Sequence, residues 1–245
     1  MQIAALVWVL VGCWCVSRAI HWLPTRLADE ENFVIAETLS LQSCEKKPVL
    51  PHVLQAPLLS FISGVPKCSF KSFGYAGAAT LVALWVYSHL GLSWDFFLWT
   101  AFGWCLLVLA AVDFQTKLLP DILTLPLMWL GMVIQLWPET RTVGLELAVI
   151  GAVAGYLPLW FFAHLYKLIR GRDGLGMGDL KLLAAMGAWS GPFILPHVLL
   201  LAALLAIALF VFERVLRRST AGIHEERPFG PAIVAAYFIV MLFAF

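Results

Sequence analysis

The sequence has little charge. Only 13% of its 245 residues are Asp, Glu, Lys or Arg, about half the share found in a soluble domain. The net charge of +1 leaves no basic excess, so we expect no nucleic acid as a partner. In contrast, 62% of the residues are hydrophobic, and several apolar runs approach the roughly 20 residues that a helix needs to cross a bilayer. The composition predicts an all-α, polytopic protein embedded in the lipid bilayer.

Cysteine pairs and processing signals are also scarce. The five cysteines are odd in number, and Cys13 and Cys15 cannot lie on the same side of one helix. The six histidines are scattered without paired spacing. We therefore predict neither a disulfide framework nor a metal site. The first apolar run has no basic flank before it and no small-residue cleavage site after it, so we interpret it as a retained helix.

Eight apolar stretches could cross the membrane: 3–23, 74–92, 96–112, 122–137, 143–166, 180–191, 193–213 and 228–245. They predict a helical bundle of about eight transmembrane segments, with a short cytoplasmic loop after the first. Two stretches, 122–137 and 180–191, are shorter than a bilayer requires, and each follows a polar segment that contains Asp. Non-helical backbone at membrane depth must lie in protein or in a watery cavity. The two short stretches therefore indicate a solvated pocket.

The basic residues predict an orientation. If the eight stretches alternate in direction, all of the 16 Lys and Arg residues except Arg141 fall on one side of the membrane. Cytoplasmic loops carry this excess, which assigns Asp113, Asp121 and Asp179 to the cytoplasmic face and both termini to the opposite one. We divide the chain into a first transmembrane helix (1–23), a cytoplasmic loop or small subdomain (24–73) and a membrane domain (74–245).

Two acidic motifs stand at the edges of these stretches. In AAVDFQTKLLPDILTLP, residues 110–126, Asp113 ends one helix, while Pro120 and Asp121 are typical of the break before the next helix and of its N-cap. In GLGMGDLKLL, residues 174–183, glycines allow close approach of the backbone. There Asp179 falls in the first turn of the next helix, whose dipole offsets part of the cost of its charge.

These acids admit more than one function. Ionisable residues at the edge of membrane spans usually face a functional cavity. Two carboxyl groups on one face of the bundle could share a proton and activate water against an amide. The same pair could instead form an ion or proton site in a transporter. From the residues alone, a peptidase and an ion- or proton-coupled transporter both remain open.

The motifs closely resemble those of the type IV prepilin peptidase family, which are GxGD membrane aspartic proteases. The stretch VDFQTKLLPDILTLPL matches the family's first aspartate motif, and residues 176–179 match GxGD. The flanking LKLLAAMGAW and the later RPFGPAI, residues 227–233, are also similar to the family. The resemblance implies that Asp113 and Asp179 are the catalytic pair and that 74–245 is an aspartic peptidase domain. The supporting motif positions are Gly176, Gly178, Lys181, Pro120 and Asp121.

The resemblance also implies a substrate, a cellular location and a cofactor requirement. It predicts removal of the leader peptide from type IV prepilins or type II secretion pseudopilins at the cytoplasmic face of the bacterial inner membrane, with no cofactor for proteolysis. Many members also methylate the new amino terminus with S-adenosylmethionine. Long bifunctional members carry two CxxC pairs in the first loop, whereas this loop has only Cys44 and Cys68. Methyltransferase activity, and with it S-adenosylmethionine as a cofactor, therefore stays an open alternative.

Some residues are expected to serve packing or membrane anchoring. Gly151 and Gly155, in GAVAG, predict close helix packing. Lys117 and Lys181 are interpreted as anchors at the membrane interface. Tryptophans near the ends of the apolar stretches predict an aromatic belt; they are Trp94, Trp99, Trp129, Trp137 and Trp189.

Overall fold

The computed structural model describes residues 2–42, 70–137, 143–171, 176–217 and 228–244. Within these residues the secondary structure is entirely helical. The helices are α1 (Gln2–Gln42), α3 (Phe70–Leu90), α4 (Trp94–Thr116), α5 (Asp121–Ile134), α6 (Leu145–Arg170), α7 (Met177–Ser190), α8 (Leu195–Arg217) and α9 (Gly230–Ala244). Each corresponds to one of the eight apolar stretches, so the predicted all-α bundle is confirmed.

Four of these helices are long and apolar enough to cross a membrane. They are Gln2–Pro24 of α1, Trp94–Thr116, Leu145–Arg170 and the Leu195–Phe212 part of α8. Shorter apolar helices are Asp121–Ile134 and the Gly230–Phe243 part of α9. This set of helices is that of a multi-pass membrane protein.

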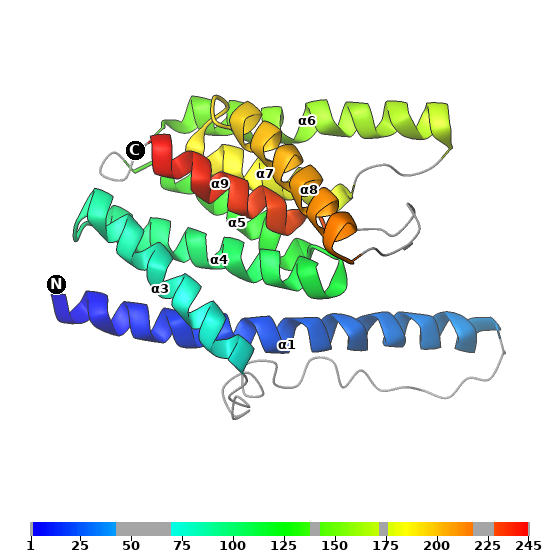
Figure 1. Cartoon of the computed structure of the whole chain (residues 1–245), viewed down its shortest axis with the longest axis horizontal. Coiled ribbons are helices and arrows are strands. Elements are labelled where there is room, and N and C mark those ends of the chain that lie inside the picture. The colour runs from blue at the N-terminus through cyan, green and yellow to red at the C-terminus, as the bar shows by residue number, and fades with distance from the viewer. Residues whose placement is uncertain (1, 43–69, 138–142, 172–175, 218–227, 245) are drawn as a thin grey trace.

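Successive helices alternate in direction along the bundle. Figure 1 shows both chain termini at one end of the molecule. The end of α4, the start of α5 and the first turns of α7 and α9 therefore lie together at the opposite end. This arrangement gathers the residues of the two acidic motifs at one end of the bundle.

The first helix is longer than its apolar stretch. We predicted that a loop or subdomain begins at residue 24, but α1 continues through Pro24 to Gln42. Proline has no N–H to donate, so it leaves the carbonyl four residues earlier in the helix without its usual partner. A membrane helix tolerates this when neighbouring groups or water satisfy that carbonyl. The cysteines of the predicted loop, Cys44 and Cys68, lie outside the described residues, and the division into three domains remains a prediction.

The two helices that begin at the acidic motifs are short. Both α5 and α7 contain 14 residues, which corresponds to about 21 Å of helix. The hydrocarbon core of a bilayer is about 30 Å thick. A helix of this length starts below one surface of the membrane, so the chain that precedes it needs polar surroundings.

Helices α6 and α7 pack with their backbones in direct contact. A Cβ atom on Gly151 would lie 2.1 Å from the carbonyl oxygen of Gly187, and one on Gly155 would lie 2.6 Å from that of Leu183. Only glycine allows such an approach. The predicted packing role of Gly151 and Gly155 is confirmed, and the contact positions α7, which carries Asp179.

An aromatic cluster joins the four helices that build the site. Trp189 of α7 stacks on Phe102 of α4 at 4.4 Å between ring centroids and donates a hydrogen bond from Nε1 to the carbonyl of Leu127 in α5 at 2.9 Å. Tyr237 of α9 meets Phe102 edge to face. Buried aromatic contacts of this kind hold helices in a defined register.

The tryptophan prediction is only partly correct. Trp94, Trp129 and Trp137 are exposed, as a belt requires, but Trp99 and Trp189 are buried in the core. A tryptophan near a helix end can lie either at the membrane interface or in the core. Its position in the sequence does not distinguish these two roles, because the neighbouring helices decide which side of α4 and α7 is covered.

Candidate active site

Asp113 lies in the last turn of α4 and is almost fully buried, with 4% of its surface exposed. The helix ends at Lys117, whose left-handed backbone (φ 57°) lets its N–H bond to the carbonyl of Asp113 at 2.8 Å. The side chain points toward α9, where the backbone N–H of Gly230 donates to Oδ2 at 2.9 Å. The tight end of α4 therefore presents this carboxyl group to a neighbouring helix.

Asp179 lies in the first turn of α7, before the 180–191 apolar stretch and outside the four candidate spans. Its backbone N–H bonds to the carbonyl of Gly176 at 3.1 Å, and 8% of the residue is exposed. Burial, and secondarily the negative charge of Asp113, raise the pKa of Asp179 to about 7. Its ordinary value is 3.8, so a substantial share of this carboxyl group stays protonated up to neutral pH.

One cavity contains both carboxyl groups. It has a volume of about 280 Å³, enough for several water molecules. The end of α4, the following turn and the starts of α5 and α7 form its wall, which consists of Asp113, Lys117, Leu118, Leu119, Asp121, Gly176, Met177, Gly178, Asp179 and Lys181. The structure thus brings together every predicted site residue except Pro120, which precedes Asp121 in the chain.

Gly178 permits the close contact that forms this wall. A Cβ atom on Gly178 would lie 2.7 Å from Cβ of Leu119, so any larger residue would push α7 away from the turn after α4. Because Asp179 follows directly, such a shift would displace it from Asp113. The motif predicted only that its glycines allow a close approach. The structure shows that Gly178 makes this approach with Leu119, at the wall of the cavity.

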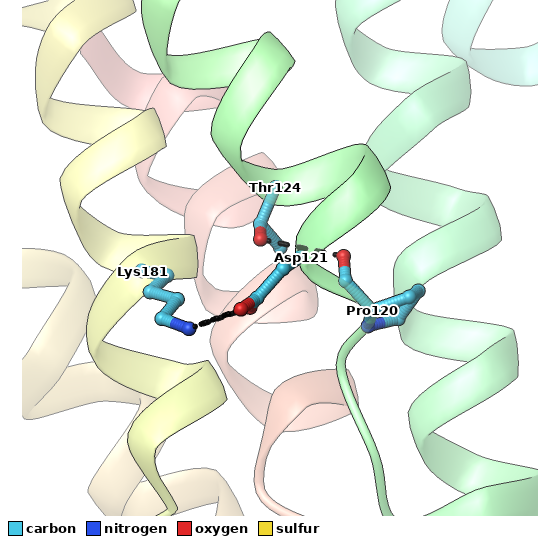
Figure 2. A network of polar contacts seen from close by, with 4 residues as sticks. All are labelled: Pro120, Asp121, Thr124 and Lys181. Atoms are coloured by element: carbon cyan, nitrogen blue, oxygen red, sulfur yellow. Dashed lines mark hydrogen bonds and ion pairs between the residues drawn. The ribbon is translucent and has the colours of Figure 1, made fainter. Parts of the chain in front are cut away.

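Asp121 has a different role from the one predicted. The N-cap of α5 is Pro120, and Asp121 is the first residue of the helix. Figure 2 shows its side chain pointing away from its own helix toward Lys181 of α7, with Nζ at 2.6 Å from both carboxylate oxygens. Thr124 provides the local contact instead, donating from Oγ1 to the Pro120 carbonyl at 3.3 Å. Lys181 is therefore held in an ion pair across the cavity, which its interpretation as a membrane anchor did not include.

This ion pair should contribute little to stability. Asp121 is 54% exposed and Lys181 26% exposed, and exposed pairs contribute about 0–1 kcal/mol because water screens them. We expect Asp121→Asn and Lys181→Met to change the melting temperature in detergent by a few degrees at most, and the double variant to show a coupling below about 1 kcal/mol. A coupling well above this value would mean that the pair is shielded from solvent.

A second cavity lies between α1 and α4. Its volume is about 390 Å³, and no acidic or basic side chain of the described chain lines it. In the same described residues, no three His, Cys, Asp or Glu side chains are grouped as metal ligands. Of these two cavities, only the smaller one is lined by acidic and basic side chains of the described residues.

Fold and site together define a class: a helical membrane protein in which two buried aspartates, from two different helices, share one cavity. Residues 100–211 match the model of the type IV leader peptidase family. The chain is 38% identical over 260 residues to a prepilin leader peptidase/N-methyltransferase of Pseudomonas aeruginosa, covering 97% of this chain and 88% of the relative. The chain belongs to the type IV leader peptidase family.

Other relatives are matched over a smaller part of their length. A prepilin leader peptidase/N-methyltransferase of Burkholderia pseudomallei is 47% identical over 208 residues, which is 84% of this chain and 60% of the relative. A protein of the same name from Neisseria gonorrhoeae is 36% identical over 198 residues, or 81% and 59%. The chain thus spans about 60% of the Burkholderia relative's length. No solved structure matches the chain.

Two contacts of the site were not foreseen from the sequence. Gly230 was noted only within RPFGPAI, and the pairing of Lys181 with Asp121 was not predicted. The available signal for Gly230 was its place directly before Pro231 at a helix start, where backbone N–H groups have no partner within the helix. No local signal existed for the ion pair, because it joins residues that are 60 positions apart.

Proposed function

We propose that this protein is a membrane aspartic endopeptidase that removes the leader peptide from type IV prepilins or type II secretion pseudopilins. The observation that carries the proposal is the pair of buried carboxyl groups, Asp113 and Asp179, in one cavity of water-holding size. The names of the relatives supply the substrate class, since each is a prepilin leader peptidase/N-methyltransferase.

The chemistry needs one proton shared by two carboxyl groups. The ionised group accepts a proton from a water molecule, whose oxygen attacks the carbonyl carbon of the scissile amide. The protonated group donates to the carbonyl oxygen, and the departing amine then takes up a proton as the C–N bond breaks. Burial and mutual repulsion favour the singly protonated pair, because two adjacent carboxylates in a poorly solvated site are costly.

We propose that the cleavage occurs at the cytoplasmic face of a bacterial inner membrane. If the apolar stretches alternate in direction across the membrane, the sequence predicts that all Lys and Arg residues except Arg141 share the side of the two acidic motifs, and cytoplasmic loops carry this excess. A substrate with a polar leader and an apolar helix within the membrane would present its scissile bond at that surface. The position of the aspartates at one end of the bundle supports cleavage over transport, since transporters commonly hold their substrate near the midplane.

N-methylation of the product is a separate activity that the names of the relatives suggest. S-adenosylmethionine carries a charged amino acid and a ribose, which require polar partners. The larger cavity described above is apolar, and the smaller one is occupied by the aspartate pair and its lysines. Neither fits this cofactor, so we derive no methyl transfer step from the described residues.

Cleavage should depend on pH through Asp179. Because burial raises its pKa to about 7, the proton needed for catalysis is present below this pH and lost above it. We expect kcat/KM to fall about tenfold for each pH unit well above 7. The measurement is cleavage of a prepilin in liposomes between pH 5 and 9, and activity that stays constant up to pH 9 would contradict the assignment.

The proposed function is tested directly by incubating the purified protein in liposomes with a prepilin. Mass spectrometry of the product locates the cut and detects any added methyl group. Cleavage at a single bond between leader and apolar helix supports the proposal, and an intact substrate with a folded protein overturns it. A methyl group on the product would show that a cofactor site exists outside the cavities described above.

A further inference from the structure

The two aspartates of the cavity have different hydrogen-bond partners. Asp113 accepts the backbone N–H of Gly230 at 2.9 Å. In the part of the chain that the structure describes, no group donates a hydrogen bond to the carboxyl group of Asp179; the bond at this residue is made by its own backbone N–H. The site is therefore asymmetric, although both residues are acids of the same type in the same cavity.

The bond from Gly230 selects a protonation state. A backbone N–H can only donate, so its acceptor gains most when it is an ionised carboxylate. Gly230 is also the first residue of α9, since the N–H groups of Ala232 and Ile233 bond to the carbonyl of Phe229. Its N–H belongs to the unpaired donors at the positive end of the helix, which favours an anion there.

Only glycine fits at this position. A Cβ atom on residue 230 would lie 2.6 Å from Oδ2 and 3.0 Å from Cγ of Asp113. Real Cβ atoms do not approach so closely, so any other residue would force the carboxyl group to shift and would lengthen its bond to the N–H. The absence of a side chain at residue 230 therefore allows the hydrogen bond to Asp113, in addition to allowing the helix to start there.

We propose that Gly230 is a positioning residue whose backbone N–H holds Asp113 as the ionised base of the pair, which leaves Asp179 as the proton-carrying acid. The proposal rests on the proposed function and assigns a separate role to each aspartate. In the reaction, Asp113 accepts the proton of the attacking water, and Asp179 donates its proton to the carbonyl oxygen of the scissile amide.

The other charged groups of the cavity are consistent with this order. Lys181 is neutralised by Asp121, so it adds little net charge near Asp179. Lys117 lies on the same helix end as Asp113 and is exposed at the cavity wall. The described part of α9 contributes no charged side chain, so its influence on Asp113 comes from the backbone. Both carboxyl groups are buried, but among the described residues only Asp113 has a backbone donor that offsets the cost of its charge, whereas the pKa of Asp179 is raised to about 7 by burial and then by the charge of Asp113.

Infrared spectroscopy tests the assignment without any substrate. The carboxylic acid band that disappears as the pH rises through about 7 should be absent from Asp179→Asn. It should remain in Asp113→Asn, shifted to lower pH because the neighbouring charge is gone. If the band is instead lost in Asp113→Asn and kept in Asp179→Asn, the proposal is overturned. This result does not require cleavage, so it stands apart from a failure of the proposed function.

A matched pair of variants tests the role of Gly230. Gly230→Ala and Gly230→Pro both place a Cβ atom against Asp113, but only proline removes the N–H, and the first position of a helix accepts proline. We expect the acidic limb of the kcat/KM profile to lie about one pH unit higher in Gly230→Pro than in Gly230→Ala. Identical limbs in the two variants would overturn the proposal. Should the proline variant not fold, the infrared comparison decides.

Discussion

Asp113→Asn and Asp179→Asn are each expected to lower kcat for prepilin cleavage by about 10²–10⁴-fold, the usual contribution of a general acid or base. Asparagine keeps the size of the side chain but can neither accept the proton of water nor donate one. The measurement is a time course of cleavage in liposomes, followed by gel electrophoresis. Either variant cutting at the normal rate would remove that residue from the mechanism.

The matched control is Asp95→Asn. Asp95 lies on the same helix as Asp113 but in its first turn, at the other end of the bundle. The Asp95→Asn variant should therefore leave cleavage unchanged.

The thermal stability of Asp179→Asn shows independently whether this variant is folded. The pKa of Asp179 is about 7 in the folded protein against an ordinary 3.8, so its contribution to stability is present at low pH and lost as the pH rises between these values. Asp179→Asn should therefore melt above wild type at pH 8 while being inactive.

Gly187→Ala should cause a large loss of stability for so small a substitution. Its Cβ atom would lie 2.2 Å from the carbonyl oxygen of Gly151 and 2.5 Å from the carbonyl carbon. These are backbone atoms, so α6 and α7 must move apart, and overpacking of this kind costs about 1–3 kcal/mol or more. We expect a melting temperature lower by several degrees and reduced cleavage, because α7 carries Asp179.

The control for this prediction is Gly77→Ala in α3, where an added Cβ atom meets nothing within 4 Å. Alanine favours a helix over glycine by about 1 kcal/mol, so this variant should be at least as stable as wild type. Thermal unfolding in one detergent compares the two directly. If both variants melt alike, the glycine contact between α6 and α7 is not as close as described.

Local patterns predicted the helices well. Apolar stretches of about 20 residues leave few alternatives to a membrane helix, and the described helices correspond to all eight of them. The short lengths of 122–137 and 180–191 correctly indicated a pocket at their starts. The first apolar stretch matches the candidate span Gln2–Pro24, but the helix itself continues to Gln42, because hydropathy reports where apolar residues stop and not where backbone hydrogen bonding stops.

Roles that depend on neighbouring helices could not be predicted in this way. Asp121 was expected to cap its own helix, because N-cap preference is a local rule, but Lys181 of another helix provides its partner. Trp189 was expected at the lipid interface, but α4 and α5 cover it. In both cases a contact between distant segments overrides the preference of the local sequence.

The sequence by itself determined the class of the protein and the helices of the described residues, and it proposed the two acids, because these follow from hydropathy, from the cost of charge near a membrane and from the motifs. Only the tertiary structure decided how the acids differ. Asp113 meets the N–H of Gly230, a residue 117 positions away, whereas Asp179 is buried without such a donor among the described residues. The physical reason is that protonation depends on the immediate surroundings of each carboxyl group, and helix packing creates those surroundings.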